Sequence, residues 1–255
     1  MKISVIGAGA MGGAMVEGWL NTSLFTPADI TAADPFESSL KRFANTGINT
    51  TCGNNEAAAD KDVVCVVVKP WLVDSVLNGI KDTLKSNQIL IVVAAGVSLA
   101  QIKAVVGNDI SVFLCIPNTA IAVKSSMTFI VPDTNATEAQ IKLVEELFNA
   151  TGSCMIVDEQ HLPAATVLAS CGIAYAMRYV RAASEGGVQL GFKADMAKDI
   201  VVQTVKGAME LLQATGNHPE TEIDKVTTPG GVTIRGLNRM EQYGFSNAVI
   251  QGLLG

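Results

Sequence analysis

Three glycines near the N-terminus have the type and spacing suited to holding a phosphate. Gly7, Gly9 and Gly12 follow the pattern G-x-G-x-x-G directly after an apolar run, residues 2–6. In a dinucleotide-binding fold the first glycine allows a tight turn, the second lets a pyrophosphate approach the backbone, and the third lets the next helix pack against its strand. The same pattern also fits a strand–helix turn that holds no ligand. The residues expected to hold the phosphates are Gly7, Gly9, Ala10, Met11 and Gly12.

A second unusual stretch, residues 227–233, places hydroxyl groups on both sides of Pro-Gly-Gly. If a helix begins after Gly231, its first amides form an anion pocket that suits a carboxylate. Thr228 then adds a hydroxyl donor, and Thr233 lies in the first helical turn over the same pocket. The alternative is a plain helix start in which Thr228 is the N-cap and Pro229 is the first helical residue. The spacing alone leaves both interpretations open.

Asp34 is the last residue of the second predicted strand and stands 22 residues after Gly12, about where a dinucleotide-binding fold places the acid that contacts the adenosine ribose. A carboxylate there repels a 2′-phosphate, so NADH should be accepted. Lys41 and Arg42 offset that charge, so NADPH is compatible as well. Asp-Pro also commonly opens a helix, here over residues 37–43, and Asp34 then serves as its N-cap.

Apolar runs and helix-period segments alternate along the first half of the chain. Continuous apolar runs are typical of parallel strands that are buried on both faces. The alternation predicts a doubly wound parallel sheet of the Rossmann type, in which ligands bind outside the carboxyl ends of the strands. The expected strands cover residues 2–6, 30–34, 49–51, 62–68, 88–94 and 111–115, with extra strands at 127–131 and 154–157. The expected helices cover residues 12–20, 37–43, 72–84, 99–106 and 138–150.

Several candidate residues fall at the predicted carboxyl ends of these strands and should therefore converge on one edge of the sheet. They are Gly7–Gly12, Asp34, Lys69–Pro70, Gly96 and Asn118–Thr119. This convergence favours a cofactor site at that edge. For Lys69 the alternative is a solvated charge at a strand end.

From Asp158 onward, helix-period patterns replace the β-branched runs. The expected helices cover residues 160–170, 173–189 and 194–215, followed by two shorter ones within 232–254. These helices are apolar on more than one face and need more burial than a small helical domain can provide, so we expect a homodimer through this half. The expected organisation is a dinucleotide-binding (Rossmann) domain at 1–158 and an all-helical dimerisation and substrate domain at 159–255.

Composition excludes several functional classes. The 255 residues are 49% hydrophobic and 16% charged, with a formal net charge of -6. An acidic chain without a basic stripe argues against nucleic acid and against an anionic membrane surface, and no apolar run reaches the length of a membrane span. With only two histidines, no metal site is expected. The chain enters a strand directly, without a secretory leader, and its five scattered cysteines are typical of reduced thiols, so we expect a cytoplasmic protein.

Six short motifs along the chain carry a family resemblance. They are Gly7–Gly12, Val68–Pro70, Ala94–Ser98, Pro117–Thr119, Ala174–Tyr175 and Pro229–Ile234. Together they resemble the pyrroline-5-carboxylate reductase family over essentially the whole chain. The resemblance implies a Rossmann domain, a helical dimerisation domain, and NADPH- or NADH-dependent reduction of 1-pyrroline-5-carboxylate to L-proline, the last step of proline biosynthesis. It also implies a homodimer, which in this family often assembles further into a decamer.

The resemblance implies roles for individual residues as well. The residues implied to hold the substrate carboxylate are Thr228, Gly230, Gly231 and Val232. The Thr233 hydroxyl is implied to be the catalytic group, hydrogen-bonded to the ring nitrogen. A protonated imine is already electrophilic, which suits a sequence without an evident catalytic histidine or pair of acids. Besides the phosphate-binding residues, the implied cofactor contacts are Asp34, Asn54, Val68, Lys69, Pro70, Ala95, Gly96 and Asn118.

Several positions depart from the usual motifs of the family, among them Thr227–Thr228, where a Ser-Ser or Cys-Ser pair is usual. Ala120 stands where proline usually follows Pro-Asn-Thr, and Ser170 and Ile173 stand where glycine and proline are usual. These departures leave two other functions open: a reductase of another cyclic imine, and a non-catalytic or degenerate dinucleotide-binding paralogue. A hydroxyacid dehydrogenase-like reductase would place a lysine in a Gly-x-x-x-Lys-x-x-Asn context, which is not recognisable here.

Overall fold

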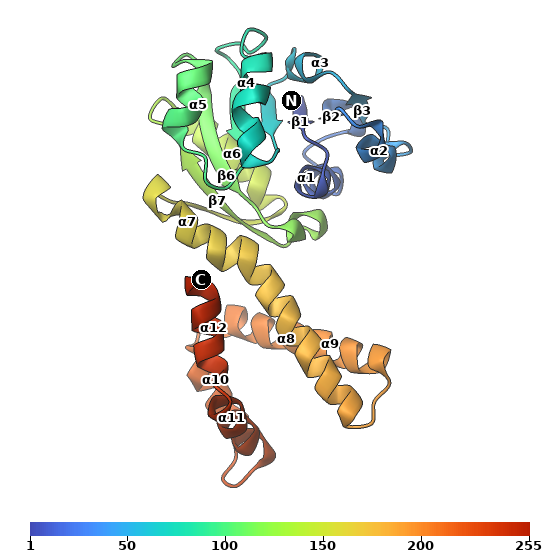
Figure 1. Ribbon diagram of the computed structural model, residues 1–255, viewed down its shortest axis with the longest axis vertical. Helices are drawn as coiled ribbons and strands as arrows, with labels where there is room; N and C mark the ends of the chain where they lie inside the picture. The colour runs from blue at the N-terminus through green and yellow to red at the C-terminus, as the bar shows by residue number, and fades with distance from the viewer. The chain divides into compact units, whose positions relative to one another are not determined.

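The computed structural model describes residues 1–255, which form two compact units, Met1–Ser170 and Cys171–Gly255. The first unit holds an eight-stranded sheet with the strand order β3-β2-β1-β4-β5-β6-β7-β8 (Figure 1). Its strands are β1 (Ile3–Ile6), β2 (Ile30–Ala33), β3 (Asn49–Thr51), β4 (Val63–Val66), β5 (Ile89–Val92), β6 (Ser111–Ile116), β7 (Ser126–Pro132) and β8 (Gly152–Ile156). The second unit is helical throughout.

The central strands β1, β2, β4 and β5 are buried along their whole length, as their apolar runs predict. β1 lies between β2 and β4 and is parallel to both, with Ile6 level with Ala33 on one side and Val66 on the other. The carboxyl ends of these strands therefore reach the same edge. Because the chain extends the sheet from β1 in both directions, the strand order reverses beside β1, and open α/β sheets bind their ligands at such a point.

One strand pair departs from the predicted parallel sheet. β6 pairs with β7 in the antiparallel direction, with Leu114 opposite Val131, and β8 then runs parallel to β7. A parallel neighbour needs a crossover connection of about a dozen or more residues, usually a helix. The connection from Ile116 to Ser126 contains only a short 3₁₀ turn, Thr119–Val123, so the chain reverses instead. The six strands from β1 to β6 are parallel, as predicted.

Helices pack on both faces of the sheet. The helices of the first unit are α1 (Ala10–Leu20), α2 (Glu37–Leu40), α3 (Asn54–Ala58), α4 (Val73–Ile80), α5 (Leu99–Val106), α6 (Glu138–Asn149) and α7 (Leu162–Ala165). Trp19 of α1 and Phe148 of α6 belong to one apolar cluster, and Trp19 Nε1 donates a hydrogen bond to the Leu147 carbonyl at 3.0 Å. Leu77 of α4 and Ile102 of α5 belong to the other apolar cluster. This double layer confirms the doubly wound class.

Two predicted helix starts are confirmed by their caps. The Ser98 side chain accepts a hydrogen bond from the Gln101 amide at the start of α5, and Thr137 forms a reciprocal capping box with Gln140 at the start of α6. The first helix begins at Ala10 rather than near Gly12.

The end of the first unit differs from the predicted helix over 160–170. Its backbone forms a 3₁₀ turn (Glu159–His161), helix α7 and a π-helical turn (Thr166–Cys171). Leu162 and Ala165 are buried in an apolar cluster of the first unit. Because these side chains belong to that core, the compact units divide after Ser170, later than the boundary at 158 that the sequence suggests.

The second unit contains α8 (Gly172–Gln189), α9 (Ala194–Thr215), α10 (Pro219–Lys225), α11 (Val232–Gln242) and α12 (Phe245–Leu254). Helix α10 is not predicted from the sequence, because it is short, largely polar and without an apolar period. The rings of Tyr179 on α8 and Phe245 on α12 meet edge to face, with centroids 6.3 Å apart. Only Ala197 is buried in this unit. None of the helices in the chain combines the length and the hydropathy that crossing a membrane requires.

Candidate functional site

A cavity of about 630 Å³ lies in the first unit at the carboxyl ends of β1, β2, β4, β5 and β6. It brings together most of the cofactor residues that the sequence predicts. Those that line it are Gly7, Gly9, Ala10, Met11, Gly12, Asp34, Asn54, Val68, Lys69, Pro70 and Ala95. Two further predicted residues, Gly96 and Asn118, do not line the cavity.

Glycine is suited to each of the three positions in the loop for a different reason. Gly7 has a φ of +101°, and a Cβ there would overlap the Val67 carbonyl oxygen. A Cβ at Gly12 would overlap the Gly7 carbonyl oxygen. Gly9 has an ordinary φ of -66°, and apart from Gly9 and its two neighbours in the chain no protein atom lies within 4 Å of the position that its Cβ would take. The packing of the chain therefore does not explain Gly9, whereas a ligand lying against the backbone does.

The amides beside Gly9 are suited to an anion. Gly9 is the N-cap of α1, no side chain caps the helix, and its first turn carries no acid. The first amides of a helix have no partner within the helix, and its dipole favours negative charge at this end. The Gly13 amide is the first to bond back, to the Gly9 carbonyl at 2.8 Å. A dinucleotide diphosphate fits this loop.

Asp34 is buried, and backbone amides hold both of its carboxylate oxygens. Oδ2 accepts a hydrogen bond from the Ala8 amide at 2.9 Å, and Oδ1 accepts one from the Phe36 amide at 3.0 Å. The side chain thus joins the end of β2 to the glycine loop. It is not the N-cap of α2, because that position is Phe36.

Two polar residues lie on other parts of the cavity wall. Asn54 is half-buried at the first position of α3. Lys69 is exposed after β4, and it is the only lysine or arginine that lines the cavity. A positive charge at this place can attract the anionic groups of a dinucleotide.

The far end of the cavity includes residues that sequence reasoning did not predict. Thr166 and Ser170 of the π-helical turn line it, together with Pro117 after β6. The Ser170 hydroxyl donates a hydrogen bond to the Pro117 carbonyl at 3.0 Å. Buried Asn118 donates to the Ala169 carbonyl at 3.5 Å, so its side chain fastens the loop to the π-helical turn instead of facing the cavity. Such π-helical turns are frequent at functional sites.

The stretch from Thr228 to Gly231 forms a tight turn in the second unit. The Gly231 amide donates a hydrogen bond to the Thr228 carbonyl at 2.9 Å, and Gly230 has a φ of +69°. Proline at the second position and a glycine with positive φ at the third are typical of a type II turn. Helix α11 begins at Val232 with Gly231 as its N-cap, so the alternative start with Thr228 as cap is wrong.

This turn leaves polar groups accessible at the start of α11. No side chain caps the helix and its first turn carries no acid. The Thr228 and Thr233 side chains are exposed. A Cβ at Gly231 would lie 2.9 Å from the Thr228 carbonyl oxygen and would overlap Thr228 Oγ1, so a side chain at this position would disturb the turn. The turn and the helix start together offer amides and hydroxyls to a small carboxylate.

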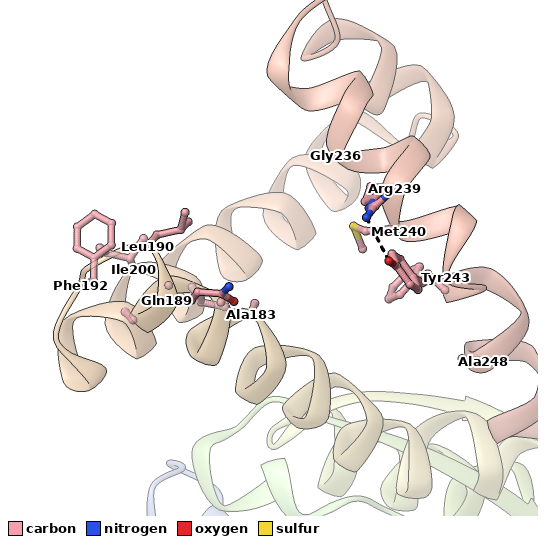
Figure 2. Close-up of a pocket in the computed structure, with 15 residues that line it drawn as sticks. Ala183, Gln189, Leu190, Phe192, Ile200, Gly236, Arg239, Met240, Tyr243 and Ala248 are labelled. Atoms are coloured by element: carbon pink, nitrogen blue, oxygen red, sulfur yellow. Dashed lines mark hydrogen bonds between the residues drawn. The ribbon is translucent and has the colours of Figure 1, made fainter.

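The second unit also contains an apolar groove of about 1230 Å³. Figure 2 shows Leu190, which directly follows α8, and Ile200 of α9 on one side of it. Met240 of α11 and Tyr243, which directly follows α11, lie on the other side. The Arg239 guanidinium donates a hydrogen bond to Tyr243 Oη at 3.1 Å. Leu190 is 82% exposed and Tyr243 75%, so much apolar surface in this groove is open to solvent.

The fold and the cavity define the class of the protein. A doubly wound sheet with a glycine loop at its switch point, followed by a helical unit, is the architecture of an NAD(P)H-dependent oxidoreductase. Residues 2–96 match a family profile described as NADP oxidoreductase, coenzyme F420-dependent. Residues 159–254 match a profile described as pyrroline-5-carboxylate reductase dimerisation. No group of three or more metal-ligating side chains is assembled anywhere in the chain.

Relatives of known name extend this likeness over the full chain. The pyrroline-5-carboxylate reductase of Methanosarcina acetivorans is 34% identical over 98% of this chain and 94% of its own length. Pyrroline-5-carboxylate reductase 1 of Dictyostelium discoideum is 35% identical over 99% of this chain, which spans 48% of that relative. The crystal structure of Plasmodium falciparum pyrroline carboxylate reductase with NADP bound superposes with a TM-score of 0.91 at 27% identity, covering 99% and 94% of the two chains. This chain belongs to the pyrroline-5-carboxylate reductase family.

Proposed function

We propose that this chain reduces 1-pyrroline-5-carboxylate to L-proline with NADPH or NADH. The observation that carries the proposal is the turn from Thr228 to Gly231, which opens into the uncapped start of α11 in a chain of this family. The cavity beside Gly9 supplies the second requirement, a place for the dinucleotide.

The proposed site residues divide into two groups. In the first unit, the amides at the start of α1 hold the diphosphate, and the remaining lining residues shape the nucleoside ends. In the second unit, the amides after Pro229 and the Thr228 hydroxyl hold the carboxylate of the cyclic imine. The Thr233 hydroxyl oxygen accepts a hydrogen bond from the protonated ring nitrogen and so orients the ring or relays its proton. The substrate-binding group is Thr228, Gly230, Gly231 and Val232, with Thr233 as the catalytic residue.

The reaction needs little acid–base chemistry from the protein. When bound, the reduced cofactor supplies a hydride to the imine carbon, the C=N bond becomes a C–N single bond, and the nitrogen keeps its proton. Positioning of the reacting atoms can contribute most of the acceleration. The Thr233 hydroxyl orients the ring, and the amides of α11 fix the carboxylate so that one ring face meets the cofactor.

We also propose that residues 171–255 form the interface of a homodimer, from which a decamer can assemble. A unit in which only Ala197 is buried has little core of its own. The apolar groove and exposed side chains such as Leu190 and Tyr243 provide surface for a second copy. Because Thr166 and Ser170 line the cavity, we extend the dinucleotide-binding part from the 1–158 that the sequence suggests to 1–170, and assign dimerisation and substrate binding to the rest of the predicted 159–255 domain.

A cytoplasmic location is part of the proposal. All five cysteines are free thiols, which are typical of a reducing compartment. Burial raises the pKa of the Cys115 thiol well above its usual value and so keeps it in the neutral, unreactive form.

One assay tests the proposed reaction against its rivals. Oxidation of NADH and of NADPH is followed with 1-pyrroline-5-carboxylate, with a keto acid, and with no added substrate. We expect oxidation only with the imine, with one L-proline formed for each cofactor oxidised. Turnover only with the keto acid would point to a hydroxyacid dehydrogenase-like enzyme, and cofactor binding without turnover would point to a degenerate paralogue.

A further inference from the structure

The adenosine end of the cavity contains a fixed negative charge and no positive one. Asp34 lines the cavity and is only 7% exposed. We propose that Asp34 makes this chain select NADH over NADPH, because its carboxylate accepts a hydrogen bond from the ribose 2′-hydroxyl and repels a 2′-phosphate. The inference rests on the proposed use of a nicotinamide dinucleotide and is independent of the identity of the substrate.

The Asp34 carboxylate cannot turn away from a ligand. Each of its oxygens accepts a backbone amide, Oδ2 from Ala8 at 2.9 Å and Oδ1 from Phe36 at 3.0 Å. Two such hydrogen bonds fix the side chain between the glycine loop and the end of β2. Each oxygen has a further lone pair that can accept a hydroxyl. An ionised 2′-phosphate has no hydroxyl proton to donate to either carboxylate oxygen of Asp34. It also brings a negative charge next to the negative charge of the carboxylate.

No cation is placed to compensate this charge. Lys69, the only lysine or arginine in the lining, follows β4, which lies on the opposite side of β1 from β2. The guanidinium of Arg42 is paired with Glu17, to which its Nε donates at 3.1 Å, and it also lies over the Phe43 ring. Neither Arg42, whose guanidinium lies against Gly13 of α1, nor Lys41 lines the cavity, so the compensation by these two residues that the sequence suggested is not found in its lining. A 2′-phosphate would therefore meet Asp34 without a neutralising partner.

Phe36 provides affinity without discrimination. Its ring lines the same end of the cavity and is 70% exposed. An aromatic ring beside the ribose position is suited to stacking on adenine, which both cofactors share. Loss of this ring should weaken both cofactors alike, whereas loss of the Asp34 charge should change the ratio between them.

Calorimetric titration with NADH and NADPH, and with AMP and 2′-AMP as probes of the adenosine end, tests the proposal without turnover. Like charges in contact near a protein surface change a binding constant by about tenfold or more. We expect the unmodified chain to bind NADH at least about tenfold more tightly than NADPH, and Asp34→Ser to abolish or invert that ratio. Equal or tighter binding of NADPH, or an unchanged ratio in Asp34→Ser, would overturn the proposal.

Matched variants separate the effect of the Asp34 charge on the NADH-to-NADPH binding ratio from the effect of neighbouring side chains on affinity. Phe36→Ala should weaken both cofactors by the same factor, and Glu37→Gln, which neutralises an exposed acid outside the cavity, should leave the ratio unchanged. If Asp34→Ser does not fold, Asp34→Asn removes the charge with the side-chain length kept, and an unchanged ratio there also overturns the proposal. If 1-pyrroline-5-carboxylate is not turned over while the binding ratio holds, the proposed reaction fails and this inference stands.

Discussion

Gly9 and Gly12 offer a direct comparison between a glycine kept for a ligand and a glycine kept for packing. Apart from Gly9 and its two neighbours in the chain, no atom lies within 4 Å of a Cβ at Gly9, whereas a Cβ at Gly12 would overlap the Gly7 carbonyl oxygen. We expect Gly9→Ala to change the free energy of unfolding by less than about 1 kcal/mol and to weaken dinucleotide binding by about tenfold or more. Gly12→Ala should instead lower stability by about 1–3 kcal/mol. Thermal unfolding and cofactor titration of both variants would check this, and a folded Gly9→Ala variant with unchanged affinity would contradict it.

Thr233 carries the catalytic role in the proposed reaction. Its side chain is exposed at the second position of α11, so its removal should not disturb the fold. We expect Thr233→Ala to lower kcat/KM by about one to two orders of magnitude, because a hydroxyl that only orients the ring contributes no more than about the 100-fold lower end of what a proton-transferring group contributes. Thr233→Ser keeps the hydroxyl and should retain most of the activity. Equal steady-state rates for Thr233→Ala and the unmodified chain would remove the role.

The cofactor-site residues that directly follow predicted strands could be identified from the sequence. Gly7, Asp34 and Lys69 each stand directly after an apolar run, and the parallel register brings all three to the same cavity. Thr166 and Ser170 could not be found in this way, because they lie on a π-helical turn far along the chain and have no distinctive pattern. The one available signal was the departure from the family motif at Ser170.

At the scale of elements, the antiparallel join of β6 and β7 is held by a largely buried ion pair. Lys103 Nζ lies 2.9 Å from Asp133 Oδ2, with side-chain exposures of 15% and 4%, and the same oxygen accepts the Val112 amide. Lys103→Met leaves a buried carboxylate without its cation, which costs about 3–5 kcal/mol in the free energy of unfolding. As a control, Lys85→Met breaks the exposed pair with Asp60 and should leave the free energy of unfolding nearly unchanged, because solvent screens such a pair. Denaturant titrations showing equal losses in both variants would contradict this assignment.

The existence of the strands follows from the sequence more readily than their direction. Runs such as 62–68 and 111–115 become β4 and β6 because both faces must be buried. The reversal into β7 depends on a connection too short for a crossover, which the apolar pattern does not reveal. Helix α10 was not predicted because its seven residues are mostly polar and show no helical repeat of apolar side chains. The helix starts at Ser98 and Thr137 were predicted correctly. Each cap depends only on a hydrogen bond to an amide three residues further along the chain, so the local sequence is enough to reveal it.

At the scale of the molecule, the helical unit should be stable only in an assembly. We expect a solution mass of at least twice the 26.7 kDa of one chain. Leu190→Asp places a charge in the apolar groove and should shift the protein toward monomer, with loss of activity. Val123→Asp, at an equally apolar position that is 71% exposed on the first unit, serves as the control and should leave the mass unchanged. Sedimentation velocity at micromolar concentration measures both variants, and a monomeric unmodified chain would refute the dimer.

The central claim is that one glycine-built turn binds the dinucleotide and a second binds the small acid, so that reduction occurs through placement. A crystal structure with the oxidised cofactor and L-proline tests this most directly. We predict the diphosphate on the amides beside Gly9, and the proline carboxylate on the amides that follow Pro229. The nicotinamide C4 should lie about 3–3.5 Å from the ring carbon next to nitrogen that carries no carboxylate. If Thr228–Thr233 of neither subunit contacts the proline, the claim is contradicted.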